Sequence, residues 1–162
     1  MRSLLLLRHA QTESTRPGSG DHARRLTPVG EQQAAAVGDH LRNTQTELDL
    51  VLCSSASRAR QTAALLRTAA PVVVSDDLYE AGGDEIIALV RDLAHDVGHV
   101  LVVAHAPGLP SVVHQLADQD ASDPQALATV RSRYPAGTLA VMAVTQAWPE
   151  LDRAALVSVR VP

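Results

Sequence analysis

The stretch LLLLRHAQTE, residues 4–13, joins four leucines directly to an arginine and a histidine. An uninterrupted apolar run of this length is typical of a strand that is buried on both faces of a sheet. Arg8 and His9 would then lie just beyond the carboxyl end of that strand. Ligands of open α/β sheets bind at this edge, so the stretch predicts both a fold class and the place of a functional site.

Apolar and helix-like segments alternate along the rest of the chain. The predicted strands are 3–7, 48–54, 71–75, 99–105, 137–144 and 153–161, and helices are predicted over 57–70, 83–96 and 108–118. A further helix is predicted to start within 26–42, with Thr27 as its N-cap and Pro28 in its first position. The last two strands are expected to form a hairpin. The segment 119–135 is expected to be a loop that holds, at most, a short helix.

This alternation predicts right-handed βαβ crossovers in an α/β fold. The expected architecture is a three-layer α/β/α sandwich, in which helices cover both faces of a mostly parallel central sheet. The continuously apolar strands are therefore expected to be buried on both sides. The length of 162 residues fits a single domain spanning 1–162.

Composition excludes several classes of protein. The formal net charge is -4, from 14 basic and 18 acidic residues, and aromatic residues make up only 2% of the chain. Nucleic-acid binding usually needs a basic surface or a stacking platform. One cysteine, Cys53, cannot form an internal disulfide, and no apolar run approaches the length of a membrane span. We expect a cytoplasmic protein that binds neither nucleic acid nor membranes.

Charged side chains follow three of the predicted strands. Arg8 and His9 end the first strand, Arg58 begins the helix after the second, and His105 ends the fourth. Folding would bring these groups together at one edge of the sheet. Two planar guanidinium groups suit a phosphate dianion. The two histidines lack a third ligand at a spacing suited to zinc, so no metal site is predicted.

His9 gains a chemical role in such a cluster. A neutral imidazole can attack phosphorus and accept a phosphoryl group, which would give a phosphohistidine intermediate that water then cleaves. Nearby cations keep the ring neutral by lowering its pKa. The arginines would stabilise the oxygens of the transferring group, and His105, if protonated, would add another positive donor.

Four segments resemble the motifs of the histidine phosphatase superfamily, which has the phosphoglycerate mutase-like fold. LRHAQTE (7–13) is similar to its R-H-G or R-H-A motif, SSASRARQT (54–62) to S-x-x-x-R-x-x-Q-T, and AHAP (104–107) to G-H-x-P. DHARRLTPVG (21–30) is similar to the D-x-x-R-P-L-T-x-x-G segment of the short SixA-type branch. The resemblance covers most of the chain in the correct order.

The resemblance implies roles for five residues. His9 is expected to be the phosphorylated nucleophile, and Arg8, Arg58 and His105 are expected to form the phosphate pocket. Arg24 occupies the position of the family's loop arginine, which helps to hold substrate. The alternative for Arg24 is an ordinary solvated loop charge.

The chain departs from the family pattern beside His105. The usual Gly-His-Asn-Pro is Ala104-His105-Ala106-Pro107 here, and Arg25 replaces the loop proline. Loss of the asparagine removes a polar side chain beside the pocket. Hydrogen bonds that support the phosphate-binding residues, and the orientation of the substrate, are therefore in question.

The general acid is expected in the segment DDLYEAGGDE, residues 76–85. It offers Asp76, Asp77, Glu80, Asp84 and Glu85, and Glu80 is our candidate because it precedes a glycine turn that could bring it over the pocket. The alternative is an exposed carboxylate before a helix. A phosphohistidine substrate needs no strong acid, because imidazole leaves phosphorus easily.

The sequence therefore predicts a metal-independent phosphatase with no cofactor. Its substrate would be a phosphorylated small molecule or a phosphohistidine protein. Two alternatives remain open: a phosphoglycerate mutase-like phosphotransferase, and a catalytically weak phosphate-binding regulatory module.

Overall fold

The computed structural model describes residues 1–15 and 17–162, which form a six-stranded sheet in the order β3-β2-β4-β1-β5-β6. The strands are β1 (Arg2–Arg8), β2 (Leu50–Ser54), β3 (Val72–Ser75), β4 (His99–Ala104), β5 (Leu139–Val144) and β6 (Ala155–Arg160). Strands β3, β2, β4 and β1 pair in parallel, whereas β5 pairs antiparallel with both β1 and β6. The predicted mostly parallel sheet and final hairpin are confirmed.

Helices cover both faces of this sheet. They are α1 (Pro28–Asn43), α2 (Ser57–Leu65), α3 (Gly83–Arg91), α4 (Gly108–Leu116) and α5 (Pro124–Ser132), with short 3-10 turns η1 (Asp21–Ala23), η2 (Asp76–Leu78) and η3 (Trp148–Glu150). Leu5 and Leu7 pack with residues of α1 and α2, and Leu4 and Leu6 pack with residues of α3, α4 and α5. The four leucines alternate between the two faces and are fully buried, which confirms the three-layer sandwich.

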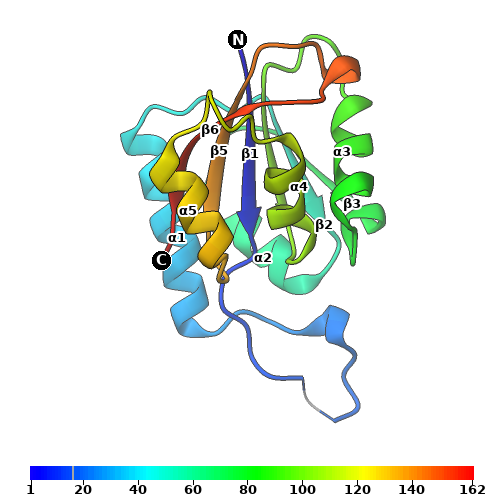
Figure 1. Cartoon of the computed structure of the whole chain (residues 1–162). Helices are drawn as coiled ribbons and strands as arrows, with labels where there is room; N and C mark the ends of the chain where they lie inside the picture. The colour runs from blue at the N-terminus through cyan, green and yellow to red at the C-terminus, as the bar shows by residue number, and fades with distance from the viewer. Residues whose placement is uncertain (16) are drawn as a thin grey trace.

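The segment between β1 and α1 lies beyond the carboxyl end of β1 (Figure 1). Thr27 caps α1 as predicted, because its Oγ1 accepts the N–H of Gly30 at 3.0 Å, and Pro28 takes the first helical position. A Cβ at Gly30 would overlap the carbonyl oxygen of Gln11. Glycine at this position therefore lets α1 pack directly against the backbone that follows His9.

Two predicted helices are longer than those of the structure. Helix α2 ends at Leu65 rather than residue 70, because Arg67 adopts a left-handed conformation with φ 53°. Helix α3 ends at Arg91 rather than residue 96, and the chain then turns back towards β4. The short helix considered for the segment 119–135 is present as the nine-residue α5, whose N-cap Asp123 accepts the N–H of Ala126 at 2.7 Å.

The expectation that all apolar strands are buried on both sides is wrong for the two edge strands, β3 and β6. Val72, Val73 and Val74 of β3 are 46–48% exposed, and Val157 of β6 is 53% exposed. The reason is the strand order, since β3 has only β2 beside it and β6 has only β5. Within the described residues, none of the helices has the length and apolar character needed to cross a membrane.

Candidate active site

His9 follows β1 directly and is 6% exposed. Its backbone N–H donates to the carbonyl of Ala104 at 3.0 Å, which fixes it beside the end of β4. The ring nitrogen Nδ1 lies 2.8 Å from the carbonyl oxygen of Ala10. A carbonyl can only accept, so Nδ1 carries the proton and Nε2 keeps its lone pair. His9 thus has one defined nitrogen available for attack.

Arg8, the last residue of β1, is held by the segment that follows α5. Its Nη1 donates to the carbonyl of Tyr134 at 2.7 Å, just after α5, and the Tyr134 hydroxyl donates to the Leu6 carbonyl at 2.9 Å. Burial, followed by the charge of Arg58, lowers the pKa of Arg8. The two cations therefore lie close enough to repel each other, an arrangement that a bound anion stabilises.

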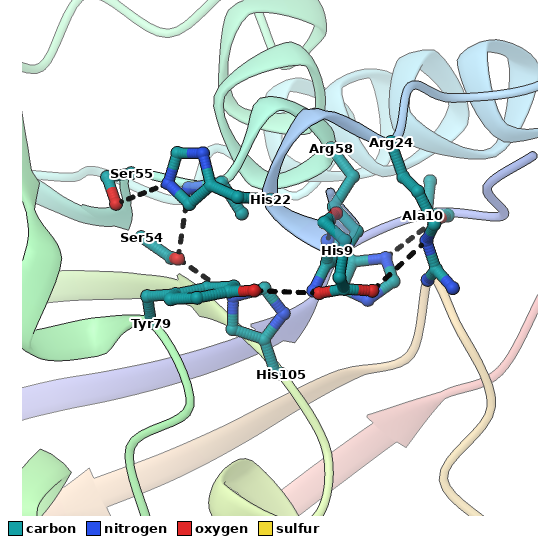
Figure 2. A network of polar contacts seen from close by, with 11 residues as sticks. His9, Ala10, His22, Arg24, Ser54, Ser55, Arg58, Tyr79 and His105 are labelled. Carbon is teal, nitrogen blue, oxygen red and sulfur yellow. Dashed lines mark hydrogen bonds and ion pairs between the residues drawn. The ribbon is translucent and has the colours of Figure 1, made fainter. Parts of the chain in front are cut away.

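Arg58 lies in the first turn of α2 and is 5% exposed. Its Nη1 donates to the carbonyl of Asp21 at 2.8 Å, and its Nη2 donates to the Asp21 carboxylate at 3.0 Å. The Tyr79 hydroxyl donates to the same carboxylate at 2.9 Å. Figure 2 shows Arg58 and Tyr79 together with His9 and His105. Asp21, in the loop after β1, thereby joins the start of α2 to the segment after β3.

Gln61 and Thr62, one helical turn after Arg58, hold the surrounding backbone. Thr62 Oγ1 donates to the Arg58 carbonyl at 2.7 Å and accepts the N–H of Ala10 at 3.1 Å. Gln61 Oε1 accepts the N–H of Leu26 at 2.9 Å. These bonds explain the spacing of arginine, glutamine and threonine in SSASRARQT, because one helix face aligns the phosphate-binding arginine with the backbone next to His9.

His105 follows β4, and its ring centroid lies 5.2 Å from that of His9. Its Nε2 is 2.8 Å from Ser54 Oγ, which also accepts the N–H of Ala56 at 3.3 Å. We assign the hydroxyl proton of Ser54 to the bond with Nε2, which places the ring proton of His105 on Nδ1. The predicted convergence of the two histidines is present.

Both histidines are neutral near neutral pH in this environment. Burial, together with the charges of Arg58, Arg8 and Arg24, lowers the pKa of His9 to about 4 against the raising effect of the Ala10 carbonyl. Burial and the charge of Arg58 lower the pKa of His105 to about 3. His105 therefore offers a neutral N–H donor rather than the positive one that protonation would give.

Several donors around His9 are arranged for an anion. Within the described chain, four buried nitrogen atoms of this cluster have no hydrogen-bond partner: Arg8 Nε, Arg24 Nε, Arg58 Nε and His105 Nδ1. Buried donors without partners are costly, and an anion with several oxygens would satisfy them. The charge of Arg24 acts on His9, and its Nε lies 3.5 Å from the Asp21 carboxylate. Arg24 is therefore ion-paired with Asp21 and lies close enough to His9 for its charge to act on the ring.

A cavity of about 310 Å³ opens above these groups. Its lining consists of Asp21, Arg58, Glu80, Ala81, His105, Ala106 and Pro107. Glu80, the predicted acid, is exposed and reaches this cavity with a left-handed backbone, φ 60°. Ala106 lines the same cavity at the position where the family pattern has asparagine.

Comparison with known proteins agrees with this geometry. The family model "Histidine phosphatase superfamily (branch 1)" matches residues 4–86. The chain belongs to this superfamily. An uncharacterized protein of Mycobacterium leprae is 32% identical over 161 residues, covering 96% of this chain and 99% of the relative.

Solved SixA structures place the chain in the SixA-type branch of the superfamily. One from Nakamurella multipartitia is 40% identical with a TM-score of 0.89, covering 99% of this chain and 96% of that one. Another, from Agrobacterium tumefaciens, is 26% identical with a TM-score of 0.84, covering 99% of this chain and 98% of that one. The histidine phosphatase fold and branch predicted from the motifs are confirmed.

Two residues of this histidine phosphatase site were not predicted. Asp21 stands first in the D-x-x-R segment, a signal that we used only for Arg24. Tyr79 precedes Glu80, and its ring packs edge-on against His22 and His105. Its contact with Asp21 joins positions 58 residues apart, which no local pattern reveals.

The described part of the chain contains no group of three or more His, Cys, Asp or Glu side chains arranged to hold a metal ion. His9 and His105 are instead surrounded by arginines. A cluster of this charge repels a divalent cation, so its chemistry is that of an anion site.

Proposed function

We propose that this histidine phosphatase hydrolyses phosphate monoesters or phosphohistidine without a metal, through a phosphohistidine intermediate on His9. The observation that carries the proposal is the position of the His9 Nε2 lone pair amid four buried nitrogen donors without partners. The lone pair supplies the nucleophile, and the donors match the oxygens of a phosphoryl group.

Two displacements make up the reaction. In the first, the bond from His9 Nε2 to phosphorus forms as the bond from phosphorus to the leaving oxygen or nitrogen breaks. Glu80 donates a proton to the leaving group. In the second, water attacks phosphorus, Nε2 leaves with its electron pair, and Glu80 takes the proton of the water. Arg8 and Arg58 stabilise the equatorial oxygens in both steps.

A phosphohistidine protein is the substrate class that the relatives favour. The SixA proteins from Nakamurella multipartitia and Agrobacterium tumefaciens are assigned as phosphohistidine phosphatases. An imidazole leaving group also tolerates the exposed position of Glu80, because its departure needs little help from an acid.

The test is phosphate release from p-nitrophenyl phosphate and from a phosphohistidine protein in the presence of EDTA. The wild type should release phosphate from both, and His9→Ala should release none. His114→Ala is the matched control, since His114 lies exposed on α4, and it should keep wild-type activity. Release that requires added metal would overturn the mechanism. Retained phosphate binding without release would favour the binding module.

A further inference from the structure

The carboxylate of Asp21 is fixed at the entrance of the phosphate site. It accepts hydrogen bonds from Arg58 Nη2 and the Tyr79 hydroxyl, and its other oxygen lies 3.5 Å from Arg24 Nε. The Asp21 carbonyl holds the remaining terminal nitrogen of Arg58. A side chain with this many partners has one defined position, so its charge is a constant feature of the entrance.

The guanidinium group of Arg58 has one part bonded to Asp21 and another part available beside His9. Both of its terminal nitrogens bond Asp21, whereas Nε is buried without a partner among the described residues. A phosphoryl group at His9 would take Nε, together with the unbonded nitrogens Arg8 Nε and His105 Nδ1. The Asp21 carboxylate would then remain beside the group that leaves.

The cavity that receives the leaving group is acidic. Among its lining residues, Asp21 carries a negative charge, Glu80 adds a second carboxyl group, and Arg58 is the one cation, already bonded to Asp21. The other lining residues are His105, which is neutral, and Ala81, Ala106 and Pro107. A substrate carboxylate in this cavity would meet the Asp21 carboxylate and no uncommitted cation.

We propose that Asp21 is a specificity-determining residue that rejects phosphorylated substrates whose leaving group carries a carboxylate and accepts neutral or cationic leaving groups. The inference rests on the proposed function, because it assumes that the leaving group enters this cavity. It disfavours phosphorylated hydroxy acids and free phosphoamino acids. Imidazole, which can carry a proton, meets no repulsion there.

Asp21 stays ionised across the working pH range. Its hydrogen bond from Tyr79 and the charge of Arg58 lower the pKa of its carboxyl against the raising effect of burial. Glu80 adds a second carboxyl group at the cavity, but it is exposed, so its effect on a bound group is more strongly screened by solvent. Replacement of Asp21 should consequently have the larger effect on charge selection.

The test compares two phosphonates that differ only in a carboxylate, ethylphosphonate and 3-phosphonopropionate, by titration calorimetry. The wild type should bind ethylphosphonate more tightly. Asp21→Asn, which keeps the size and hydrogen-bonding oxygen of the side chain, should shift the affinity ratio about three- to tenfold towards 3-phosphonopropionate at low salt. Asp77→Asn, an exposed carboxylate of η2 outside the cavity lining, should keep the wild-type ratio.

A salt titration of the wild type gives a second measurement that needs no variant. The preference for ethylphosphonate should shrink as ionic strength rises, because screening weakens the repulsion. An unchanged ratio in Asp21→Asn, a ratio insensitive to salt, or no binding of either phosphonate would each overturn the inference. Because a phosphonate has no scissile ester, the ratio is measured whether or not the protein turns over. Failure of phosphate release would instead overturn the proposed function.

Discussion

The proton on Nδ1 of His9 decides which ring nitrogen can attack phosphorus. The Ala10 carbonyl holds that proton, and burial, aided by the surrounding arginines, keeps the other nitrogen unprotonated. The same cations that would bind the phosphoryl oxygens therefore also help to maintain the nucleophile.

Arg58→Lys tests whether the shape of the guanidinium matters as well as its charge. Lysine keeps the positive charge, but it lacks the several N–H donors in one plane with which a guanidinium group can bond Asp21 and a phosphoryl oxygen at once. We expect kcat/KM for p-nitrophenyl phosphate to fall on the order of 10²-fold, as for loss of one preorganised donor. Steady-state kinetics measures the change.

Arg60→Lys is the matched control for this substitution. Arg60 is exposed two residues further along α2, and it lines a different cavity. Its kcat/KM should equal that of the wild type. Equal losses in the two variants would contradict a specific role for Arg58.

Among the elements, the joint between α2 and the end of β1 positions the nucleophile. Thr62 accepts the N–H of Ala10 across that joint, and its hydroxyl donates to the Arg58 carbonyl within α2. Thr62→Val keeps the side-chain shape and leaves the buried Ala10 N–H without its acceptor. We expect it to lower the free energy of unfolding by about 1–3 kcal/mol, measured by urea denaturation, and to lower kcat.

Thr129→Val provides a control with the same local geometry. Thr129 on α5 also donates to the carbonyl four residues earlier, Gln125, but it lies at the surface and contacts no part of the site. Its stability and kcat should stay close to wild type. A Thr62 variant that behaves like the Thr129 variant would show that this joint does not position His9.

The element boundaries show what the sequence could predict and what it could not. The Thr27 cap and Pro28 gave the start of α1 correctly, because capping depends on neighbouring residues alone. The same signal, Asp123 followed by Pro124, was present at the start of α5 and was overlooked. The end of α2 was harder to predict from the sequence, because the left-handed residue that ends it is Arg67 and not the glycine that usually marks such a position.

At the scale of the whole molecule, the sheet brings residues 8, 9, 58 and 105 to one edge. This convergence was predictable because the carboxyl ends of parallel strands meet there. The exposure of β3 was not, because it depends on the strand order. The contacts of Asp21 with Arg58 and Tyr79 also depend on how two loops meet, which motif spacing does not encode.

The two buried histidines make the stability of the whole molecule depend on pH. Their pKa values are lowered to about 4 and about 3, whereas histidines of the unfolded chain titrate near about 6.5. Between these values the unfolded chain binds more protons than the folded one, so stability is full above about pH 6.5 and falls as the pH drops towards 4. By pH 4 we expect a loss of about 3 kcal/mol per histidine.

Urea denaturation across this pH range checks the expectation with His105→Asn. This variant should lose less stability on acidification than the wild type does. His114→Asn removes an exposed histidine and should follow the wild-type curve. Parallel curves for all three proteins would show that burial in the site does not couple protonation to folding.

The most direct test of the central claim is to map the phosphoryl group on the enzyme during turnover. The protein is mixed with a phosphohistidine protein or p-nitrophenyl phosphate in EDTA, quenched in alkali, and analysed by peptide mass spectrometry. The account predicts one phosphoryl group on His9, attached through Nε2, and none in His9→Ala. A phosphoryl group on another residue, or full turnover by His9→Ala, would contradict it.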